Sequence, residues 1–342
     1  MKISVLIACR DEPTNPTLGW VLEGFAAQQL DAGDELDILV GFDGHMVGIT
    51  AEWGNGVPIH ILGLPRIGAA AVRNELAGLS RADVLLFGNA DARPQPGMVA
   101  AHLRRQRELP PNRIVLGNAP WEKGAAPTVF DALLAETAAV FFYNQMRAGE
   151  CYDWRHAWTL NLSMRREDFQ HVGGFDEQLR PVYYEDVELA WRVLGGEAKG
   201  VFYEPAAAVI HRHPTTLEQY LDREELLGLM APVLGRVNPA AFAALLGGKT
   251  PEELAREFAG WVKVDAGMHR WIYQRLQAWA TLDAASLGEG VQRTRVLETI
   301  YQMHVPLKRL AFRVGFLRGM DLAADLHWQE RRPTGLWRAA MV

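Results

Sequence analysis

Short apolar runs alternate with helically spaced segments over the first third of the chain, and this alternation restricts the fold more than any other feature. The first run is rich in β-branched residues, as expected for a strand that is buried on both faces. The runs lie at 3–8, 36–41, 59–62, 84–87 and 113–116. The intervening helical segments lie at 18–30, 68–79 and 96–107. Strands that alternate with helices predict an α/β domain with a mainly parallel sheet.

The character of the sequence changes in its last third, where helical spacing becomes almost continuous. A clear helix start lies at Thr250, which is followed by Pro251 at the first helical position and by Glu253 three residues after the cap. We therefore expect one domain at 1–215 and an α-helical C-terminal extension at 216–342.

The overall composition is that of an ordinary globular protein, with 49% hydrophobic and 22% charged residues among 342. The net charge of −6 gives no reason to expect a nucleic-acid partner. The chain has 2 cysteines, and Cys9 falls within the first apolar run, so a disulfide framework is not expected. Reduced cysteines fit a cytoplasmic protein.

The first apolar run resembles a signal peptide only in its hydrophobicity. Arg10, Asp11 and Glu12 follow it at once, where a cleavage site would have small residues. We interpret the run as a first strand. No stretch of the sequence approaches the ~18 apolar residues that a membrane-spanning helix needs.

One segment of the C-terminal extension suggests peripheral contact with the inner face of the membrane. Apolar residues at helical spacing lie among cations there: Leu307, Leu310, Ala311, Val314 and Leu317, with Lys308, Arg309, Arg313 and Arg318 nearby. Such a helix can rest on an anionic membrane surface. The alternative is a helical cap on the first domain or a homodimer interface. Tryptophans and leucines at helical spacing favour this alternative, because they usually form a core.

Polar clusters follow several of the predicted strands, at Arg10-Asp11-Glu12, Asp43-Gly44 and Asn89-Ala90-Asp91. Ligands of open α/β sheets bind at the carboxyl ends of the strands, so these clusters together predict a shared pocket. Loop solvation would explain any one of them alone. Asp91 comes directly after a buried strand, where its carboxylate could hold a cation that offsets the charge of a diphosphate. Mg²⁺ and Mn²⁺ prefer such oxygen ligands, and Mn²⁺ also accepts histidine.

A second candidate site combines a glycine turn with a helix start. Gly173 and Gly174 precede Glu185 and Asp186, which fall at the N-terminus of a predicted helix. Simple capping would explain these acids, because the helix dipole favours carboxylates at this end. The glycine turn could instead aim the segment into a pocket, where a carboxylate could act as a general base toward a hydroxyl.

A histidine pair follows the last apolar run of the first domain. His211 and His213 point to one side if the strand continues through them, because side chains alternate along a strand. A surface pair without a role is the alternative. The cysteines and the remaining histidines show no zinc-ligand spacing.

These motifs, in this order, resemble the family 2 glycosyltransferases of the GT-A fold over roughly residues 2–213. Residues 4–12 look like the opening strand and nucleotide-binding loop of that family. Residues 39–44 resemble its Asp-Asp-Gly-Ser segment, with Phe42 in place of the first Asp. Residues 68–74 are similar to its Gly-x-x-x-Ala-Arg-Asn helix start. Asn89-Ala90-Asp91 falls where the family carries Asp-x-Asp, with Asn89 in place of the first acid.

The resemblance implies a donor site for a nucleotide-diphosphate sugar, with a UDP-sugar favoured. The implied donor-binding residues are Ala8, Arg10, Glu12, Asp43, Gly68, Arg73, Asn89 and Asp91. Asp43 matches the position that recognises the nucleobase. A divalent cation, Mn²⁺ or Mg²⁺, would be held by Asp91 with His211 or His213. Because Asn89 removes one anionic ligand, the dependence on metal stays open.

The glycine turn and the acids that follow it look like the acceptor-side motif of galactosyltransferase-type regions. By that resemblance Asp186 is the base, with Glu185 beside it, and Trp158, Gly174 and Glu185 contact the acceptor. The implied reaction is a direct displacement that inverts the anomeric centre. The acceptor would be a glycan, a lipid-linked sugar or a small molecule.

Phe42 and Asn89 also motivate a rival reading, in which a catalytically degenerate GT-A domain binds a nucleotide or a partner without turnover. The intact pair of Glu185 and Asp186 argues against it, because a binding module has no need of a base.

Overall fold

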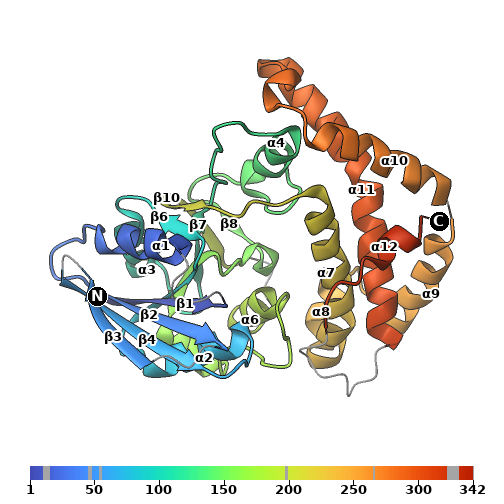
Figure 1. Cartoon of the computed structure of the whole chain (residues 1–342). Coiled ribbons are helices and arrows are strands. Elements are labelled where there is room, and N and C mark those ends of the chain that lie inside the picture. The colour runs from blue at the N-terminus through green and yellow to red at the C-terminus, as the bar shows by residue number, and fades with distance from the viewer. Residues whose placement is uncertain are drawn as a thin grey trace. The chain divides into compact units, whose positions relative to one another are not determined.

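The computed structural model describes residues 1–10, 16–44, 48–53, 56–196, 199–264, 266–321 and 331–341. Glu12, which was assigned to the donor site, lies outside the described residues, as does Asp11. The chain forms two compact units, and Figure 1 colours it by residue number. The first unit contains residues 1–122 and 146–213, and the second contains 123–145 and 214–342.

The first unit is built on a 10-stranded sheet with the order β3-β4-β2-β1-β5-β9-β7-β10-β6, and β8 also pairs with β10. Its strands are β1 (Lys2–Cys9), β2 (Glu35–Asp43), β3 (Gly48–Trp53), β4 (Val57–Leu64), β5 (Val84–Asn89), β6 (Ala92–Pro94), β7 (Ile114–Asn118), β8 (Cys151–Tyr152), β9 (Asn161–Arg165) and β10 (Val201–His211). Strands β4, β2, β1 and β5 are parallel neighbours, as are β7 and β10. Strand β9 lies antiparallel between β5 and β7. The predicted α/β fold with a mainly parallel sheet is confirmed.

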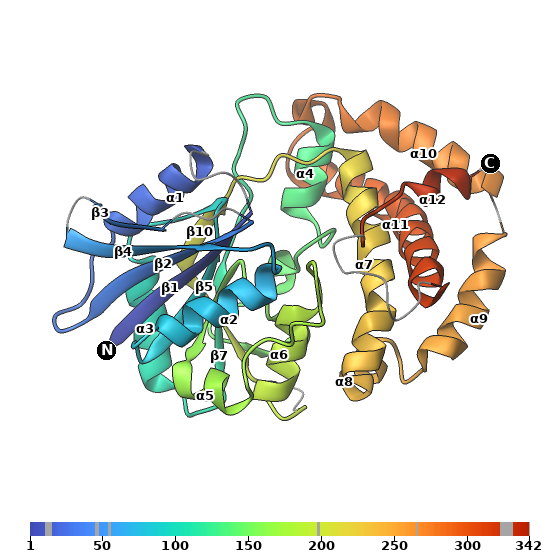
Figure 2. The same ribbon diagram turned by 60° about the horizontal axis from the view of Figure 1, so that its bottom comes forward.

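Helices cover both faces of this sheet (Figure 2). They are α1 (Pro16–Ala26), α2 (Ala69–Leu79), α3 (Met98–Glu108), α5 (Arg166–His171) and α6 (Glu185–Val193), with the short turn η3 (Trp154–His156). Helix α2 packs on Gly41 of β2, where an added side-chain carbon would lie 2.5 Å from Val72. On the other face, a side-chain carbon at Gly88 would lie 3.9 Å from Phe25 of α1. Gly41 and Asn89 share a pairing partner in β1, so the side chain of Asn89 points to the side of α2.

Strand β10 shapes one end of the sheet. A bulge shifts its register against β7 between Glu204 and Ala208. The last residue of the strand, His211, pairs with Ala92 of β6. The strand continues through the bulge, from Val201 to His211.

The second unit consists of helices. They are α4 (Val129–Glu136), α7 (Leu217–Val237), α8 (Pro239–Leu245), α9 (Pro251–Val262), α10 (Ala266–Ala280), α11 (Gly290–Asp321) and α12 (Leu336–Ala339), with the short turns η2 (Tyr143–Gln145) and η4 (Ala284–Leu287). Glycines let α7 and α11 cross closely. A side-chain carbon at Gly228 would lie 1.9 Å from the carbonyl oxygen of Phe312, and one at Gly315 would lie 1.8 Å from that of Glu225. The helical C-terminal region that the spacing predicted is confirmed.

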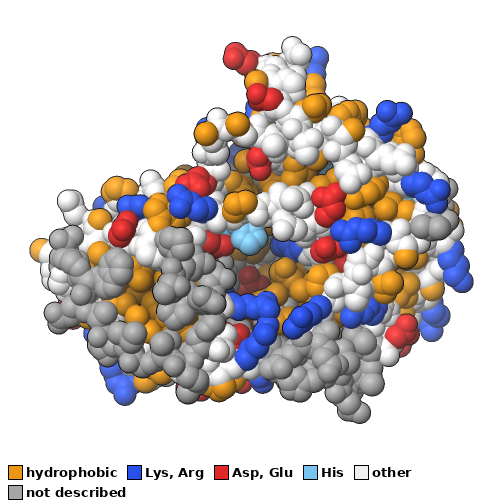
Figure 3. All heavy atoms as spheres, viewed as in Figure 1, with side chains coloured by type: hydrophobic (Ala, Val, Ile, Leu, Met, Phe, Trp, Pro, Cys, Tyr) orange, Lys and Arg blue, Asp and Glu red, His pale blue; other side chains and the backbone are white. Residues whose placement is uncertain are grey.

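The apolar side of α11 is packed inside the helical unit. Leu307, Leu310 and Ala311 are no more than 1% exposed. Three of the five apolar residues on which the membrane hypothesis depends are therefore not at the surface, and Val314 and Leu317 are half-buried. Over this unit, Figure 3 shows Lys and Arg side chains among hydrophobic ones. Among the described residues, no helix combines the length and hydropathy that crossing a bilayer requires.

Residues 123–145 belong to the helical unit, although the sequence assigned them to the first domain. The backbone N–H of Val129 donates to the carbonyl of Leu282 at 2.8 Å, and Arg293 of α11 forms an ion pair with Glu136 of α4 at 2.5 Å. These contacts join segments far apart in the chain, so local spacing could not reveal them.

Candidate active site

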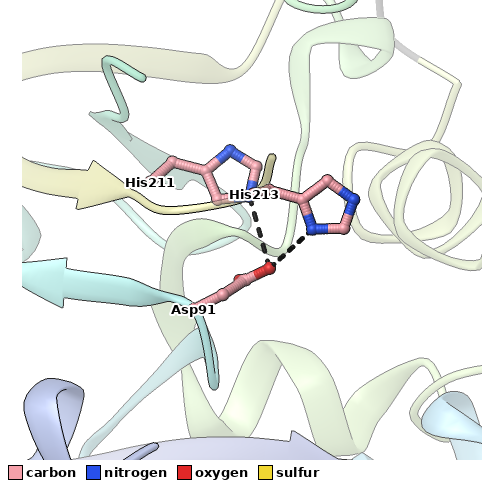
Figure 4. A group of neighbouring side chains, drawn as sticks. All are labelled: Asp91, His211 and His213. Atoms are coloured by element: carbon pink, nitrogen blue, oxygen red, sulfur yellow. Dashed lines mark hydrogen bonds and ion pairs between the residues drawn. The ribbon is translucent and has the colours of Figure 1, made fainter. Parts of the chain in front are cut away.

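Asp91, His211 and His213 form a compact cluster in the first unit (Figure 4). Nδ1 of His213 lies 3.0 Å from Oδ2 of Asp91, and Nε2 of His211 lies 3.5 Å from the same oxygen. Figure 4 shows both imidazole rings turned toward the carboxylate. One ligand atom from each residue lies within 4.8 Å of the others, which is close enough for a single metal ion.

The pairing of β6 with β10 creates this cluster. Asp91 lies between β5 and β6, and its carbonyl accepts a hydrogen bond from the backbone N–H of Arg212 at 2.8 Å. The side chain of Arg212 points away from the cluster, forms an ion pair with Glu122 at 2.6 Å and lies 3.9 Å above the ring of Trp20. Because side chains alternate along a strand, the histidines on either side of Arg212 face Asp91. The structure thus brings together the three residues that the resemblance assigned to a metal.

The electrostatics of Asp91 suit a cation ligand. Burial opposes its charge, but the imidazoles of His211 and His213 outweigh burial and lower the pKa of Asp91 below its ordinary value. The carboxylate is therefore ionised at neutral pH, as a metal ligand must be. Among the described residues, Oδ1 of Asp91 is a buried oxygen without a hydrogen-bond partner, although such atoms normally have one. One carboxylate and two imidazoles fit Mn²⁺ better than Mg²⁺, which prefers an all-oxygen set.

Arg73 of α2 links the end of β5 to the start of α6. Its Nη1 donates to Oε1 of Glu185 at 3.0 Å, and its Nη2 donates to Oδ1 of Asn89 at 3.3 Å. Arg73 and Glu185 are each 5% exposed, so they form a buried ion pair whose disruption would leave an uncompensated charge. Asn89 is bound to this arginine and is not part of the metal cluster. Asn89, which stands where the resemblance places a first acid, is thus hydrogen-bonded to the guanidinium of Arg73.

Asp186 lies next to Glu185 in the first turn of α6 and keeps part of its surface accessible. Its Oδ1 accepts from the backbone N–H of Val187 at 2.8 Å, and the backbone of Thr159 also hydrogen-bonds to it. Burial, and then the charge of Glu185, raise the pKa of Asp186 to about 7, and the backbone bonds and Arg73 offset this only in part. A carboxyl group with a pKa near the working pH suits a general base.

Asn74 fixes the glycine turn that precedes α6, a role that the sequence alone did not indicate. Its side-chain oxygen accepts from the backbone N–H of Phe175 at 2.9 Å, and its side-chain nitrogen donates to the carbonyl of Phe175 at 3.0 Å. Gly174 has a φ of 75°, and a side-chain carbon there would lie 2.6 Å from Oδ1 of Asn74. Arg73 and Asn74 are adjacent, so one holds the start of α6 and the other holds the turn that leads to it. The signal available in the sequence was the adjacent pair Arg73-Asn74 near the start of α2.

Arg192 holds the same turn from within α6. Its Nη1 and Nη2 donate to the carbonyls of Val172 and Gly174 at 2.6 and 2.7 Å. Its Nε donates to Glu188, a residue 2% exposed, at 2.7 Å. Arg192 and Glu188 therefore fix the position of α6 against the glycine turn.

Asp43, which the resemblance assigned to nucleobase recognition, fixes the start of α2. Its Oδ1 accepts from the backbone N–H groups of Ile67 and Gly68 at 2.6 and 3.0 Å. Gly68 has a φ of 89°, and a side-chain carbon there would lie 3.3 Å from Arg180. These contacts position the helix that carries Arg73.

The remaining predicted residues lie at the same edge of the sheet or near Asp186. Ala8 of β1 pairs with the ends of β2 and β5, and Arg10 follows β1 with its side chain exposed. Trp158 directly precedes Thr159, whose backbone contacts Asp186. Trp158 is therefore one residue from a backbone contact of the candidate base, and its ring centroid lies 5.8 Å from that of His156.

No protein-family model matches the chain. A part of it is 38% identical over 89 residues to the validoxylamine A glucosyltransferase of Streptomyces hygroscopicus subsp. jinggangensis (strain 5008), which is 25% of this chain and 18% of that protein. A part is also 37% identical over 82 residues to the pre-mycofactocin glycosyltransferase of Mycobacterium tuberculosis (strain CDC 1551 / Oshkosh), which is 24% of this chain and 17% of that protein. The chain covers less than a fifth of the length of these curated relatives.

Among solved structures, the chain is similar to the mannosyltransferase PcManGT from Pyrobaculum calidifontis in complex with GDP-Man and Mn²⁺. The TM-score is 0.47 at 14% sequence identity, over 93% of this chain and 85% of that chain.

Proposed function

We propose that this chain is a glycosyltransferase of the GT-A fold that moves a sugar from a nucleotide-diphosphate donor to a hydroxyl acceptor with inversion. The local similarity to two glycosyltransferases supports the reaction class. The observation that carries the proposal is the bridge formed by Arg73. It joins Asn89, two residues from Asp91, to Glu185, which is next to Asp186. A cation-binding cluster and a candidate base therefore occur together in one unit.

The cation-binding residues would be Asp91, His211 and His213, and their two imidazoles favour Mn²⁺ over Mg²⁺. A bound divalent cation offsets the charge that develops on a departing diphosphate. Asn89 is neutral and bound to Arg73, so Asp91 is the one carboxylate of this set. We therefore expect cation binding to depend strongly on Asp91.

Asp186 is the proposed base. It accepts the proton of the acceptor hydroxyl while the hydroxyl oxygen bonds to the anomeric carbon. The bond from that carbon to the diphosphate breaks, and its electron pair leaves with the diphosphate. This single displacement inverts the anomeric centre. Glu185 keeps the proton affinity of Asp186 high. Trp158, next in the chain to Thr159, is the proposed aromatic contact for an acceptor sugar.

A UDP-sugar is the donor we favour, and the acceptor is a glycan, a lipid-linked sugar or a small molecule. We place the chemistry in residues 1–215, because the cluster and the base both lie there. We propose a cytoplasmic location, in keeping with two cysteines, Cys9 and Cys151, that are not joined in a disulfide. The helical residues beyond 215 would serve contact with a membrane or a second copy rather than the reaction itself.

A thermal-shift screen tests this proposal. Wild-type protein is mixed with UDP, GDP, dTDP or CDP, each with Mn²⁺, with Mg²⁺ or without metal. A ligand at 100 times its dissociation constant stabilises a protein by ~2.7 kcal/mol, which such a screen detects readily. We expect one nucleotide to raise the melting temperature with Mn²⁺ and to do so weakly without metal. Asp91→Ala should abolish the metal-dependent part.

The matched control is Asp31→Ala, which removes an exposed acid at the opposite end of β2 from Asp43. It should leave the nucleotide shift unchanged. If no nucleotide shifts the melting temperature under any condition, the donor site does not exist. If a nucleotide binds but no sugar donor is turned over, the degenerate binding module is the better account.

A further inference from the structure

A chain of hydrogen bonds is buried between α3 and the sheet, and it contains none of the residues assigned to the reaction. It runs from Gln106 and His102 of α3 to Ser163 and Asn161 of β9, all at most 1% exposed. Nε2 of Gln106 lies 3.1 Å from Oγ of Ser163, which is 2.9 Å from Nδ1 of His102. Nε2 of His102 is 2.8 Å from Oδ1 of Asn161. Buried polar groups are costly, so a complete chain of this kind calls for an explanation.

The direction of every bond in this chain follows from its last member. Nδ2 of Asn161 donates to two carbonyls, so its Oδ1 must accept. His102 therefore donates from Nε2, and its Nδ1 accepts from the hydroxyl of Ser163. Burial lowers the pKa of His102 to about 4, in agreement with a neutral ring that has one N–H. Ser163 in turn accepts from Gln106, so every donor and acceptor of the chain is assigned.

Of the two carbonyls that Asn161 binds, one belongs to the β10 bulge and the other to the neighbouring strand β7. They belong to Asn118 of β7 at 3.0 Å and to Ala207 of β10 at 2.7 Å. Residues 205–207 stand between the β10 residues that pair with Gly117 and Asn118. The regular ladder is interrupted there, and the side-chain amide supplies the missing donors. A side-chain carbon at Gly117 would lie 2.2 Å from Nδ2 of Asn161, so the sequence leaves room for this amide.

The bulge determines which side chains at the end of β10 face Asp91. Beyond it, Ala208 accepts from the backbone N–H of Gln95 at 2.8 Å, and β10 pairs with β6 up to His211. Side chains alternate along a strand, so the number of residues in the bulge sets which of them face Asp91. A bulge that loses its anchor can slip, and a slip of one residue would exchange a histidine for Arg212.

We infer that Asn161, oriented by His102, is a positioning residue that fixes the β10 bulge and thereby holds His211 and His213 against Asp91. This inference rests on the proposed function in treating those three residues as cation ligands. Its structural part, the control of β10 by Asn161, does not depend on any ligand. Partners behind metal ligands commonly change metal affinity by about 10- to 100-fold when they are removed.

Hydrogen–deuterium exchange on the metal-free protein tests the structural part. The backbone N–H groups of His211 and Arg212 donate to Pro120 and Asp91 in the described structure. In Asn161→Ala, peptides covering 207–213 should exchange about tenfold faster or more, because the bulge has lost the side chain that holds it and opens locally. Peptides of β1 should keep the wild-type rate. Equal exchange at 207–213 in the variant and the wild type would overturn the inference.

Mn²⁺ affinity, measured by calorimetry or electron paramagnetic resonance, tests the link to the ligands. Asn161→Ala and His102→Leu should each weaken Mn²⁺ binding by about tenfold or more. His102→Gln keeps a neutral donor for Asn161 and should recover most of the affinity. The matched control is Ser80→Ala, which removes the buried hydrogen bond of Ser80 to Ser4 at the other end of β1. It should lower stability and leave Mn²⁺ affinity within about twofold.

The outcomes separate this inference from the proposed function. If Asn161→Ala does not fold, the pair His102→Leu and His102→Gln decides, because only the second retains a donor. Equal Mn²⁺ affinities and equal exchange in that pair would overturn the inference. If the wild type binds no Mn²⁺ but exchange at 207–213 responds to Asn161, then the cation proposal fails and the control of β10 by Asn161 stands.

Discussion

Asp91 and Asp186 are two carboxylic acids of the same unit in opposite electrostatic surroundings. At Asp91, burial is outweighed by the imidazoles of His211 and His213, and the pKa is lowered. At Asp186, burial and the neighbouring charge of Glu185 act together, and the pKa is raised. Environments that shift the pKa values of two acids in opposite directions suit the two acids to different tasks. The first is a permanent anion that can hold a cation, and the second is a group that can take up and release a proton.

The two surroundings are joined by one side chain. Arg73 bonds to Asn89 near the first acid and to Glu185 next to the second. These two bonds of Arg73 do not involve Asp91 or Asp186. Its charge nevertheless lowers the proton affinity of Asp186. The contrast therefore depends on which neighbours are charged, and single substitutions can sharpen it or remove it.

The largest effect is expected from Asp186→Asn. The substitution keeps the size of the side chain and removes the base, so sugar transfer should fall by about 100- to 10,000-fold. Binding of Mn²⁺ and nucleotide should stay as in the wild type, because the cation cluster is separate. Initial rates and thermal shifts on one preparation measure both. The control is Glu167→Gln, an exposed acid on α5. A transfer rate within a few-fold of the wild type would remove Asp186 from the mechanism.

A smaller effect is expected on the pH dependence. The base works only when unprotonated, so the transfer rate should fall as the pH drops through about 7, where Asp186 gains its proton. Glu185→Gln removes the adjacent negative charge and keeps an acceptor for Arg73. The fall should then move to lower pH by about one unit, which is ~1.4 kcal/mol of interaction. A pH–rate profile of both proteins measures it. A shift to higher pH would contradict the role given to Glu185.

The smallest effect is expected from Asn89→Asp, which restores the first acid of the Asp-x-Asp pattern. Asn89 is bound to Arg73 and lies outside the cation cluster. The new carboxylate should pair with Arg73, and Mn²⁺ affinity should change by less than about threefold. Calorimetric titration measures the change. An increase of tenfold or more would show that this position reaches the cation after all.

The parts of this account that were predictable from sequence are those set by local pattern. The apolar runs located β1, β2, β4, β5 and β7, and the acids after the glycine turn marked the start of α6. Alternation indicated that the two histidines share one side. In each case the signal lies within a few residues, and burial on both faces of a parallel sheet makes it strong.

The remaining parts depend on contacts between distant segments. Strand β9 inserts between β5 and β7, and the bulge of β10 is held by Asn161, neither of which leaves a local pattern. The two hydrogen bonds of Arg73, to Asn89 and to Glu185, join three elements. The sequence motifs identified these residues but could not show that they bind one another. Asn74 was visible only as part of a motif, because its role is to bond the backbone of a turn a hundred positions away.

The most direct test of the central claim is turnover of a nucleotide sugar by the wild-type protein. The protein is given Mn²⁺ and a panel of nucleotide sugars that carry the nucleotide identified by thermal shift. Release of the nucleoside diphosphate is measured, and the anomeric configuration of the product is determined by NMR. The account predicts release that needs Mn²⁺, is lost in Asp91→Ala and in Asp186→Asn, and yields an inverted anomeric centre. Release that continues at the wild-type rate in both variants, or a product with retained configuration, would contradict it.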